Sequence, residues 1–346
     1  MRLTRLVTDG WRTRLPAWSS EVSETILLIL ALALVIDRVV GDPDWLWARV
    51  PHPVVFFGKA IGFFDARLNR EDLEDSARKF RGVVAILLLL GISAWFGHLL
   101  HRLFAVLGPL GFLLEAVLVA VFLAQKSLAD HVRRVAGGLR QGGLEGGRAA
   151  VSMIVGRDPK TLDEPAVCRA AIESLAENFS DGVVAPIMWG AVLGLPGMVA
   201  YKAINTADSM IGHRTPRHEA FGFAAAKVDD AVNIPGSRLA AFLLAVAALF
   251  HDDADFHRAV ETVRRDADNH RSPNAGWPEA AMAGALALRL SGPRVYHGAL
   301  TDDEWIGEGR EEANSADIRR ALGLYKTACT VQIVALGLLA VVIALL

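Results

Sequence analysis

Long apolar runs alternate with charged stretches along the chain, and this alternation sets the expected architecture. A helix needs about 20 mainly apolar residues to cross the roughly 30 Å hydrocarbon core of a bilayer. Runs that approach this length, some with help from flanking residues, occupy residues 25–40, 83–104, 110–124, 183–201, 239–250 and 328–346. The pattern predicts an all-α, polytopic integral membrane protein with about four to six membrane helices.

The run 183–201 differs from the others because it is rich in helix-breaking residues. It contains Pro186, Gly190, Gly194, Pro196 and Gly197. Irregular backbone is tolerated at membrane depth where it is buried in protein or lines a cavity. We therefore expect a broken or re-entrant membrane element here, with helical polar segments on both sides.

The charged stretches divide the chain into an N-terminal extension and one membrane domain. Residues 1–23 mix basic and acidic side chains and are expected to remain as an uncleaved extension. Residues 24–346 are expected to form a single membrane domain, with extramembrane segments at about 41–82, 125–182 and 251–327. Lysine and arginine are frequent in 41–82 and 125–182, which is typical of a cytoplasmic side.

Composition narrows the class of protein further. Hydrophobic residues make up 53% of the chain and charged residues 21%, so the charge must be segregated from the apolar runs. A formal net charge of −2 argues against a general nucleic-acid binder, which would be strongly basic. Two cysteines cannot form a disulfide framework, and the ten histidines show no metal-ligand spacing.

The polar segment before the broken run carries charged residues at a helical spacing. Arg169, Glu173, Glu177 and Asp181 lie four residues apart and would share one helix face, with Asn178 beside them. A solvated face with an Arg169–Glu173 ion pair would explain this pattern without a site. Carboxylates at a membrane boundary are costly, however, and are often functional.

A second polar group follows the broken run. It comprises Lys202, Asn205, Asp208, Asp229, Asp230 and Asn233. Carboxylate and amide oxygens are hard ligands that suit Mg²⁺, and an ammonium group suits phosphoryl oxygens. The group therefore favours a site for Mg²⁺ and phosphate, although salt bridges between helices would give the same composition.

Two further segments carry candidate ligand-binding residues. The loop at 272–279 includes Asn274, Trp277 and Glu279, and its tryptophan could either stack on a flat ligand or close the loop. His52 lies between Pro51 and Pro53 in an extended segment.

Four sequence blocks resemble the CobD/CbiB family of cobalamin biosynthesis, the membrane-bound adenosylcobinamide-phosphate synthases. The blocks are Asp37–Pro43 with Pro51–Val54, Gly156–Asp158 with Arg169–Pro186, Tyr201–Gly212 with Asp229–Arg238, and Ser272–Gly284. Together they cover about residues 25–346. The chain departs from the family pattern in residues 1–23, in a segment one residue longer at 234–238, and at His213, where tyrosine is common.

The resemblance implies an ATP-dependent amide ligase. Such an enzyme joins a propionate carboxylate of adenosylcobyric acid to the amine of (R)-1-amino-2-propanol O-phosphate, giving adenosylcobinamide phosphate, ADP and phosphate. ATP would be a co-substrate and Mg²⁺ the metal. Other expected partners are the lipid bilayer, further cobalamin-assembly enzymes and a second copy of the chain, but not nucleic acid. The expected location is the cell inner membrane, with the catalytic face in the cytoplasm.

Roles are assigned on this basis to the residues named above. The catalytic candidates are Glu173, Glu177, Asp181, Lys202, Asp208, Asp229 and Asp230. The metal candidates are Glu173, Glu177, Asp181 and Asp208. The substrate-binding candidates are Asp42, His52, Arg157, Arg169, Asn178, Asn205, Arg214, Asn233, Asn274, Trp277 and Glu279.

Two other classes of protein stay open from the sequence. A transporter of corrinoids or other small molecules would also have a broken span with charged flanks. A membrane scaffold that holds cobalamin-assembly enzymes would need no turnover of its own. A CDP-alcohol phosphotransferase is disfavoured, since its ordered Asp-Gly…Gly…Asp…Asp signature does not appear on one span.

Overall fold

The fold is almost entirely helical. The computed structural model describes residues 17–155, 159–213, 215–296, 299–301 and 303–346. The α-helices are α1 (Ala17–Val39), α2 (Asp44–Trp47), α3 (Pro53–Leu68), α4 (Asp75–Val106), α5 (Pro109–Val121), α6 (Gln125–Val151), α7 (Glu164–Phe179), α8 (Ala185–Ala207), α9 (Phe223–Ala248), α10 (Phe256–Asp266), α11 (Gly276–Leu286) and α12 (Ser315–Leu345). The shorter helices are the 3₁₀ turns η1 (Pro159–Thr161) and η4 (Ala267–Asn269) and the π-helical turns η2 (Ser180–Val184) and η3 (Asp208–Gly212).

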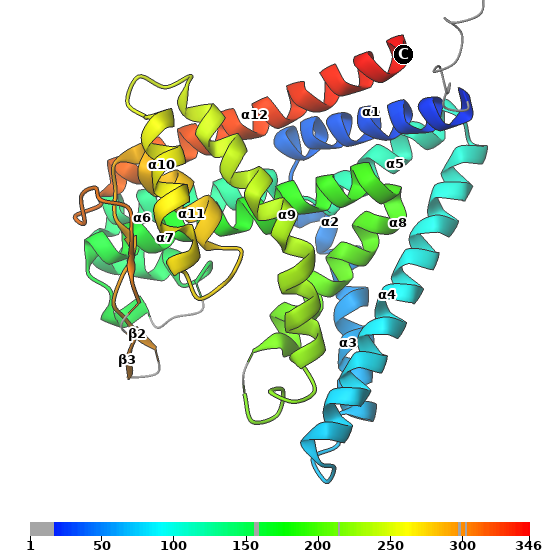
Figure 1. The fold of residues 1–346 in the computed structure, drawn as a ribbon, viewed down its shortest axis with the longest axis horizontal. Coiled ribbons are helices and arrows are strands. Elements are labelled where there is room, and N and C mark those ends of the chain that lie inside the picture. Colours follow the sequence, from blue (N-terminus) through cyan, green and yellow to red (C-terminus); the bar gives the residue numbers. More distant parts are fainter. Residues whose placement is uncertain (1–16, 156–158, 214, 297–298, 302) are drawn as a thin grey trace, which may run out of the picture.

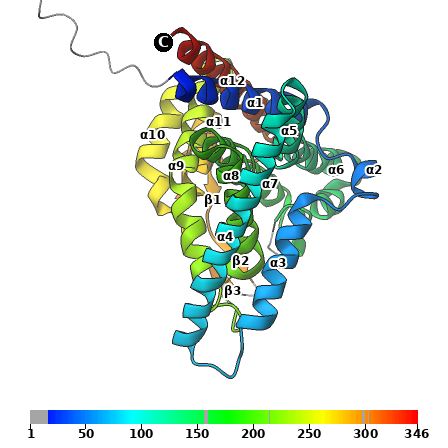
Figure 2. The same cartoon turned by 90° about the vertical axis from the view of Figure 1, so that its right-hand side faces the viewer.

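Five helical stretches within the described residues are long and apolar enough to cross a membrane. They are Asp75–Val106, Pro109–Val151, Glu164–Gly212, Phe223–Ala248 and Ser315–Leu345. This confirms the predicted all-α polytopic membrane class. The predicted run 25–40 forms most of α1, which lies beside α12 and α5 (Figures 1 and 2).

The interruption predicted in 183–201 is present, and it lies in α8. Gly194 has φ 67° and ψ −161°, a conformation that an L-residue avoids, and Pro196 follows two residues later. Helix α4 crosses α8 at this point, because a Cβ atom on Gly97 would lie 2.8 Å from Pro196 Cα. The two helices thus pack backbone to backbone where α8 changes direction.

Two apolar cores hold the helices together. The larger core joins α1 and α5–α12, and includes Phe179 and Tyr325, whose rings meet edge to face at 5.3 Å. The smaller core lies between α3, α4 and the ends of α8 and α9 that meet there, around Ile61, Ile204 and Phe221. The polar residues discussed below lie near the boundary between these cores.

The segment 251–327 forms the end of the molecule that carries α10 and α11 (Figure 1). It also contains four short strands that the sequence did not predict: β1 (Leu290–Ser291), β2 (Arg294–Tyr296), β3 (Ala299–Thr301) and β4 (Trp305–Ile306). The antiparallel pairs are β1 with β4 and β2 with β3. Helix α12 begins at Ser315, well before the apolar run at 328–346, because Asn314 and Asp317 form a capping box at its first turn.

Candidate functional site

A hydrogen-bonded group of buried side chains joins α8 to α9. Tyr201 Oη lies 2.7 Å from Asn233 Oδ1 and 2.9 Å from the carbonyl oxygen of Asp181. Asn233 Nδ2 donates to Asp229 Oδ2 at 2.9 Å, and Asn205 Nδ2 points at Asp229 Oδ1 from 3.5 Å, the long limit of a hydrogen bond. The side chains of Tyr201, Asp229 and Asn233 are buried, whereas that of Asn205 is half-buried.

Charged side chains from other parts of the chain surround this group. The carboxylate of Asp181 is attracted by the ammonium of Lys202 and repelled by Glu177 and Asp229. Lys202 is attracted by Asp42 as well, which lies at the corner before α2. Asp229 is repelled in turn by Asp208 and Asp230. We call the set Asp181, Lys202, Asn205, Asp208, Asp229 and Asn233, together with Tyr201, the polar cluster.

Two carboxylates of the polar cluster lie in π-helical turns. Asp181 belongs to η2 at the end of α7, and Asp208 opens η3 at the end of α8. Such turns are rare and occur frequently at functional sites, because the wider turn redirects a side chain. The helical spacing in the sequence gave no signal of either turn.

The carboxylate of Asp208 occupies space that a glycine leaves open. A Cβ atom on Gly212 would lie 1.9 Å from Asp208 Oδ1. Any other residue at position 212 would therefore displace this carboxylate. The sequence Asp-Ser-Met-Ile-Gly thus forms the turn and leaves room in it for its own acid side chain.

The predicted helix face with Arg169, Glu173, Glu177 and Asp181, here called the stripe, divides into two parts. Glu173 is buried and accepts a hydrogen bond from the backbone N–H of Ser291 at 2.8 Å. Arg169 donates to the carbonyl of Glu311 at 2.6 Å and lies over the Trp305 ring. These two residues of the stripe therefore contact the strand segment, whereas Asp181 contacts the polar cluster.

The other two α7 candidates, Glu177 and Asn178, are exposed to solvent. Glu177 is exposed and close enough to Asp181 to repel it. Asn178 is also exposed, and its amide donates to the carbonyl of Ser174 one turn earlier. Glu177 is thus the α7 acid that lies near the cluster and is exposed to solvent.

The loop 272–279 packs beside the polar cluster, on α9. Asn274 Nδ2 donates to the carbonyl of Asp230 at 2.8 Å, and Asn274 Oδ1 accepts from Arg238 at 3.0 Å. The guanidinium of Arg238 covers the Trp277 ring at 4.3 Å from its centroid. Glu279 is buried 3.8 Å from His270. In this structure Asn274, Trp277 and Glu279 therefore hold the loop, and their contact with a substrate stays a prediction.

His52 and Asp42 form the corner between α1 and α3. His52 caps α3, where its Nδ1 accepts from the backbone N–H of Val54, and its Nε2 lies 3.7 Å from Asp42. The ring of Trp47 meets His52 edge to face at 4.4 Å. Two further candidates, Arg157 and Arg214, lie outside the described residues.

The sequence analysis missed one residue of this site, Tyr201, and one beside the corner that carries Asp42, Lys126. Tyr201 was read only as part of a block, yet its hydroxyl connects α7, α8 and α9. Lys126 was not considered; its side chain packs against Gly41, where a Cβ atom would lie 2.8 Å from Lys126 Cδ, and it pairs with Asp130 at 3.0 Å. Gly41 has φ +64°, and its place directly before Asp42 was the available signal.

The cluster chemistry fits magnesium that arrives with a nucleotide. Within the described ranges no three histidine, cysteine or acidic side chains come together closely enough to hold a metal ion by themselves. Mg²⁺ in nucleotide sites usually keeps several waters and is bound through one or two carboxylates plus phosphate oxygens. Asp181 with Glu177, or Asp229 with Asp208, could supply such a pair.

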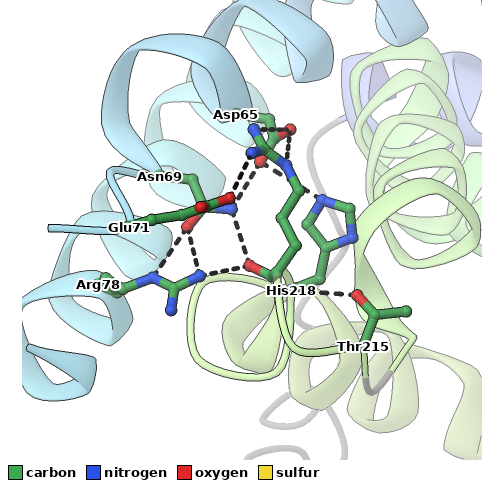
Figure 3. A network of polar contacts seen from close by, with 7 residues as sticks. Asp65, Asn69, Glu71, Arg78, Thr215 and His218 are labelled. Carbon is green, nitrogen blue, oxygen red and sulfur yellow. Dashed lines mark hydrogen bonds and ion pairs between the residues drawn. The ribbon is translucent and has the colours of Figure 1, made fainter. Parts of the chain in front are cut away.

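The segment that follows η3 is fixed by a polar network at the α3–α4 turn (Figure 3). Arg217 binds Asp65 at 3.0 Å, and its carbonyl accepts hydrogen bonds from Asn69 and Arg78. His218 Nε2 lies 3.4 Å from Asp65. Burial opposes ionisation of Asp65, but the hydrogen bonds from Asn69 and Arg217 outweigh it and hold its pKa below the usual range.

Comparison with known proteins identifies the family. The family model described as CobD/Cbib protein matches residues 30–325. Among curated relatives named cobalamin biosynthesis protein CobD, one from Sinorhizobium sp is 76% identical over 90% of this chain and 97% of its own length. Relatives with the same name from Rhizobium meliloti and Rhodobacter capsulatus are 60% and 47% identical, over 90% of this chain and 96% and 97% of theirs. No solved structure matches.

These relatives match the helices that carry the polar cluster as well as most of the membrane domain. The chain belongs to the CobD/CbiB family of cobalamin biosynthesis.

Proposed function

We propose that the chain is an ATP-dependent amide ligase that joins adenosylcobyric acid to (R)-1-amino-2-propanol O-phosphate. The observation that supports this most is the polar cluster itself. It brings a lysine, several carboxylates and two amides together at the ends of α7 and α8 and on α9. These are the groups that an enzyme needs to hold phosphates and to accept a proton from an amine.

The proposed reaction has two steps, each of which conserves atoms and charge. A propionate oxygen of the corrinoid attacks the γ-phosphorus of ATP, and ADP leaves, giving an acyl phosphate. The amine then attacks the acyl carbon, the C–N bond forms while an amine proton passes to Asp229, and the acyl C–O bond breaks so that inorganic phosphate leaves. Mg²⁺ would neutralise the nucleotide charge in the first step.

The residues of the cluster divide between these tasks. Asp181 and Glu177 would hold the nucleotide-bound Mg²⁺, and Lys202 would contact the transferring phosphoryl oxygens. Asp229 is held by the amide of Asn233 at 2.9 Å, which fixes its orientation for accepting the amine proton. ATP is used in the cytoplasm, so the polar cluster would face that side of the inner membrane.

The test is synthesis by the full-length protein purified in detergent. Adenosylcobyric acid, aminopropanol phosphate and Mg-ATP are supplied, and adenosylcobinamide phosphate and ADP are measured in parallel. Equal amounts of the two products are expected, with none when ATP is omitted. Glu177→Gln should lose most turnover, whereas Glu145→Gln, the same change at an exposed α6 carboxylate, should keep it.

Two outcomes would overturn the proposal. Corrinoid flux across proteoliposomes without ATP would favour a transporter. A protein that forms no product in this assay, while a known cobalamin enzyme works on the same corrinoid stock, would favour a scaffold.

A further inference from the structure

Helix α3 has a continuous outward stripe of apolar and basic side chains. Its exposed residues are spaced one to four positions apart and lie on one face of the helix. They are Val55, Phe56, Lys59, Phe63 and Arg67. The opposite face buries Ile61 against α4 and α8. We call the exposed stripe the α3 outer face.

The cations of the α3 outer face lie over aromatic rings of the same helix. Lys59 Nζ is 6.0 Å from the centroid of the Phe56 ring, and the Arg67 guanidinium is 5.4 Å from that of Phe63. A ring attracts a cation to its face, and the aliphatic stem of the cation covers apolar surface. Each pair thus combines an apolar surface with a positive charge above it.

The carboxylate of α3 is turned away from this face. Asp65 points toward His218 in Figure 3 and lies 3.4 Å from it, and it also pairs with Arg217 at 3.0 Å. Two acids of the adjoining α3–α4 turn are paired as well, Asp72 with Arg70 and Glu71 with Arg217. The α3 outer face itself carries two positive charges and no negative one.

The position of α3 places this face where α4 leaves the membrane. Helix α4 has 32 residues and is about 48 Å long, so it exceeds the roughly 30 Å hydrocarbon core. Its first turns are charged, and α3 packs along that half of it (Figures 1 and 2). Helix α3, with 16 residues, is about 24 Å long and too short to cross.

A neighbouring pair of helices repeats the same arrangement. Lys79 of α4 lies 5.4 Å from the ring centroid of Phe223 at the start of α9, and the adjacent Phe80 is 69% exposed. Aromatic rings at headgroup level and cations that reach past them are typical of the boundary between membrane and water.

We propose that the α3 outer face rests in the membrane–water interface and binds anionic phospholipid headgroups through Lys59 and Arg67. Apolar contact by Val55, Phe56 and Phe63 with the acyl region would hold the helix at the surface. The two cations would then select negatively charged headgroups over zwitterionic ones. This inference does not depend on the ligase reaction.

The experiment is a lipid titration of the full-length protein in detergent, followed by native mass spectrometry. Short-chain phosphatidylglycerol and phosphatidylcholine are titrated separately. The wild type should prefer phosphatidylglycerol, and K59Q/R67Q should lower its affinity roughly fivefold per cation removed. Phosphatidylcholine binding should not change. The charge-conserving K59R/R67K and the control Arg264→Gln, an exposed arginine on α10, should behave like the wild type.

Both altered residues are exposed, so the variants should fold, and their melting temperatures check this. Equal affinity for the two lipids in the wild type would overturn the proposal. So would an unchanged phosphatidylglycerol affinity in K59Q/R67Q. A dimer that crosslinks through cysteines introduced at positions 59 and 63 would assign the face to a second copy of the chain instead.

Discussion

Tyr201 Oη and Asn233 Oδ1 lie 2.7 Å apart, and this contact fastens α8 to α9 inside the polar cluster. The same hydroxyl lies 2.9 Å from the carbonyl of Asp181, at the π-helical turn after α7. One side chain therefore sets the relative positions of three chain segments. Its removal should affect both the stability of the fold and the alignment of the acid groups.

Tyr201→Phe is expected to lower stability and turnover together. The change leaves buried polar groups without a partner, which costs about 1–3 kcal/mol. Tyr325→Phe provides the matched control, because Tyr325 Oη donates to the carbonyl of Gln125 at 2.9 Å, equally buried but outside the cluster. Thermal unfolding should show similar losses for both variants, whereas the rate of cobinamide phosphate formation should fall at least about tenfold in Tyr201→Phe alone. Equal turnover in the two variants would contradict a role for Tyr201 in aligning the cluster.

Glu173 and Glu177 should respond differently to substitution although both were candidate metal ligands. Glu173→Ala leaves the buried N–H of Ser291 unsatisfied and should cost about 1–3 kcal/mol of stability. Glu177→Gln changes an exposed side chain and should lower turnover at least about tenfold, with a smaller loss of stability than Glu173→Ala. Calorimetry and the ligase assay separate the two effects. A stable Glu173→Gln variant without turnover would instead support a catalytic role for Glu173.

Gly212→Ala should inactivate the protein by displacing Asp208. The added Cβ would lie 1.9 Å from Asp208 Oδ1, so the carboxylate or the turn η3 must move. Gly62→Ala is the control, because no atom lies within 4 Å of its Cβ position and α3 favours alanine. We expect turnover to be lost in the first variant and kept in the second, as measured by the coupled release of ADP. An active Gly212→Ala would remove Asp208 from the site.

Acid should destabilise the α3–α4 turn through Asp65. Its pKa is lower in the folded protein than in the unfolded chain, so the ionised form contributes stability above the unfolded value of 3.8, and this is lost as pH falls through the folded pKa. Asp65→Asn should be less stable at neutral pH and lose less stability on acidification. Melting temperatures from about pH 7 to about pH 3 check this. Parallel curves for the two proteins would contradict the assignment.

Membrane helices and the broken element could be predicted because they depend on local composition. Apolar runs marked α4, α5 and most of α12, and glycine with proline marked the bend in α8 at Gly194. Helix α12 begins at Ser315, before the apolar run at 328–346, because its first turns are polar and are stabilised by the capping box at Asn314 rather than by apolar periodicity.

The candidate site was predictable only in part, for a related reason. Asn205 and Asp208 lie near Asp229, and Lys202 near Asp181, because short spacings on the helices bring these side chains together, whereas their roles stay predictions. The partner of Glu173 could not be foreseen, because Ser291 follows it by 118 residues and the strand that carries Ser291 has only two residues. Contacts of such separation depend on tertiary packing, which a single sequence does not encode in any local pattern.

The π-helical turn η2 has a consequence for the register of its helix. An extra residue in a helical turn rotates all later side chains by about 100° around the axis. Positions four apart therefore cease to face the same neighbour across Ser180–Val184. The residues before η2, such as Glu173, therefore face the strand segment, whereas those after it face the interior of the protein, although the helix continues through the turn. Deleting one residue within η2 would remove this rotation. Every side chain from there to the bend at Gly194 would then point toward a different neighbour.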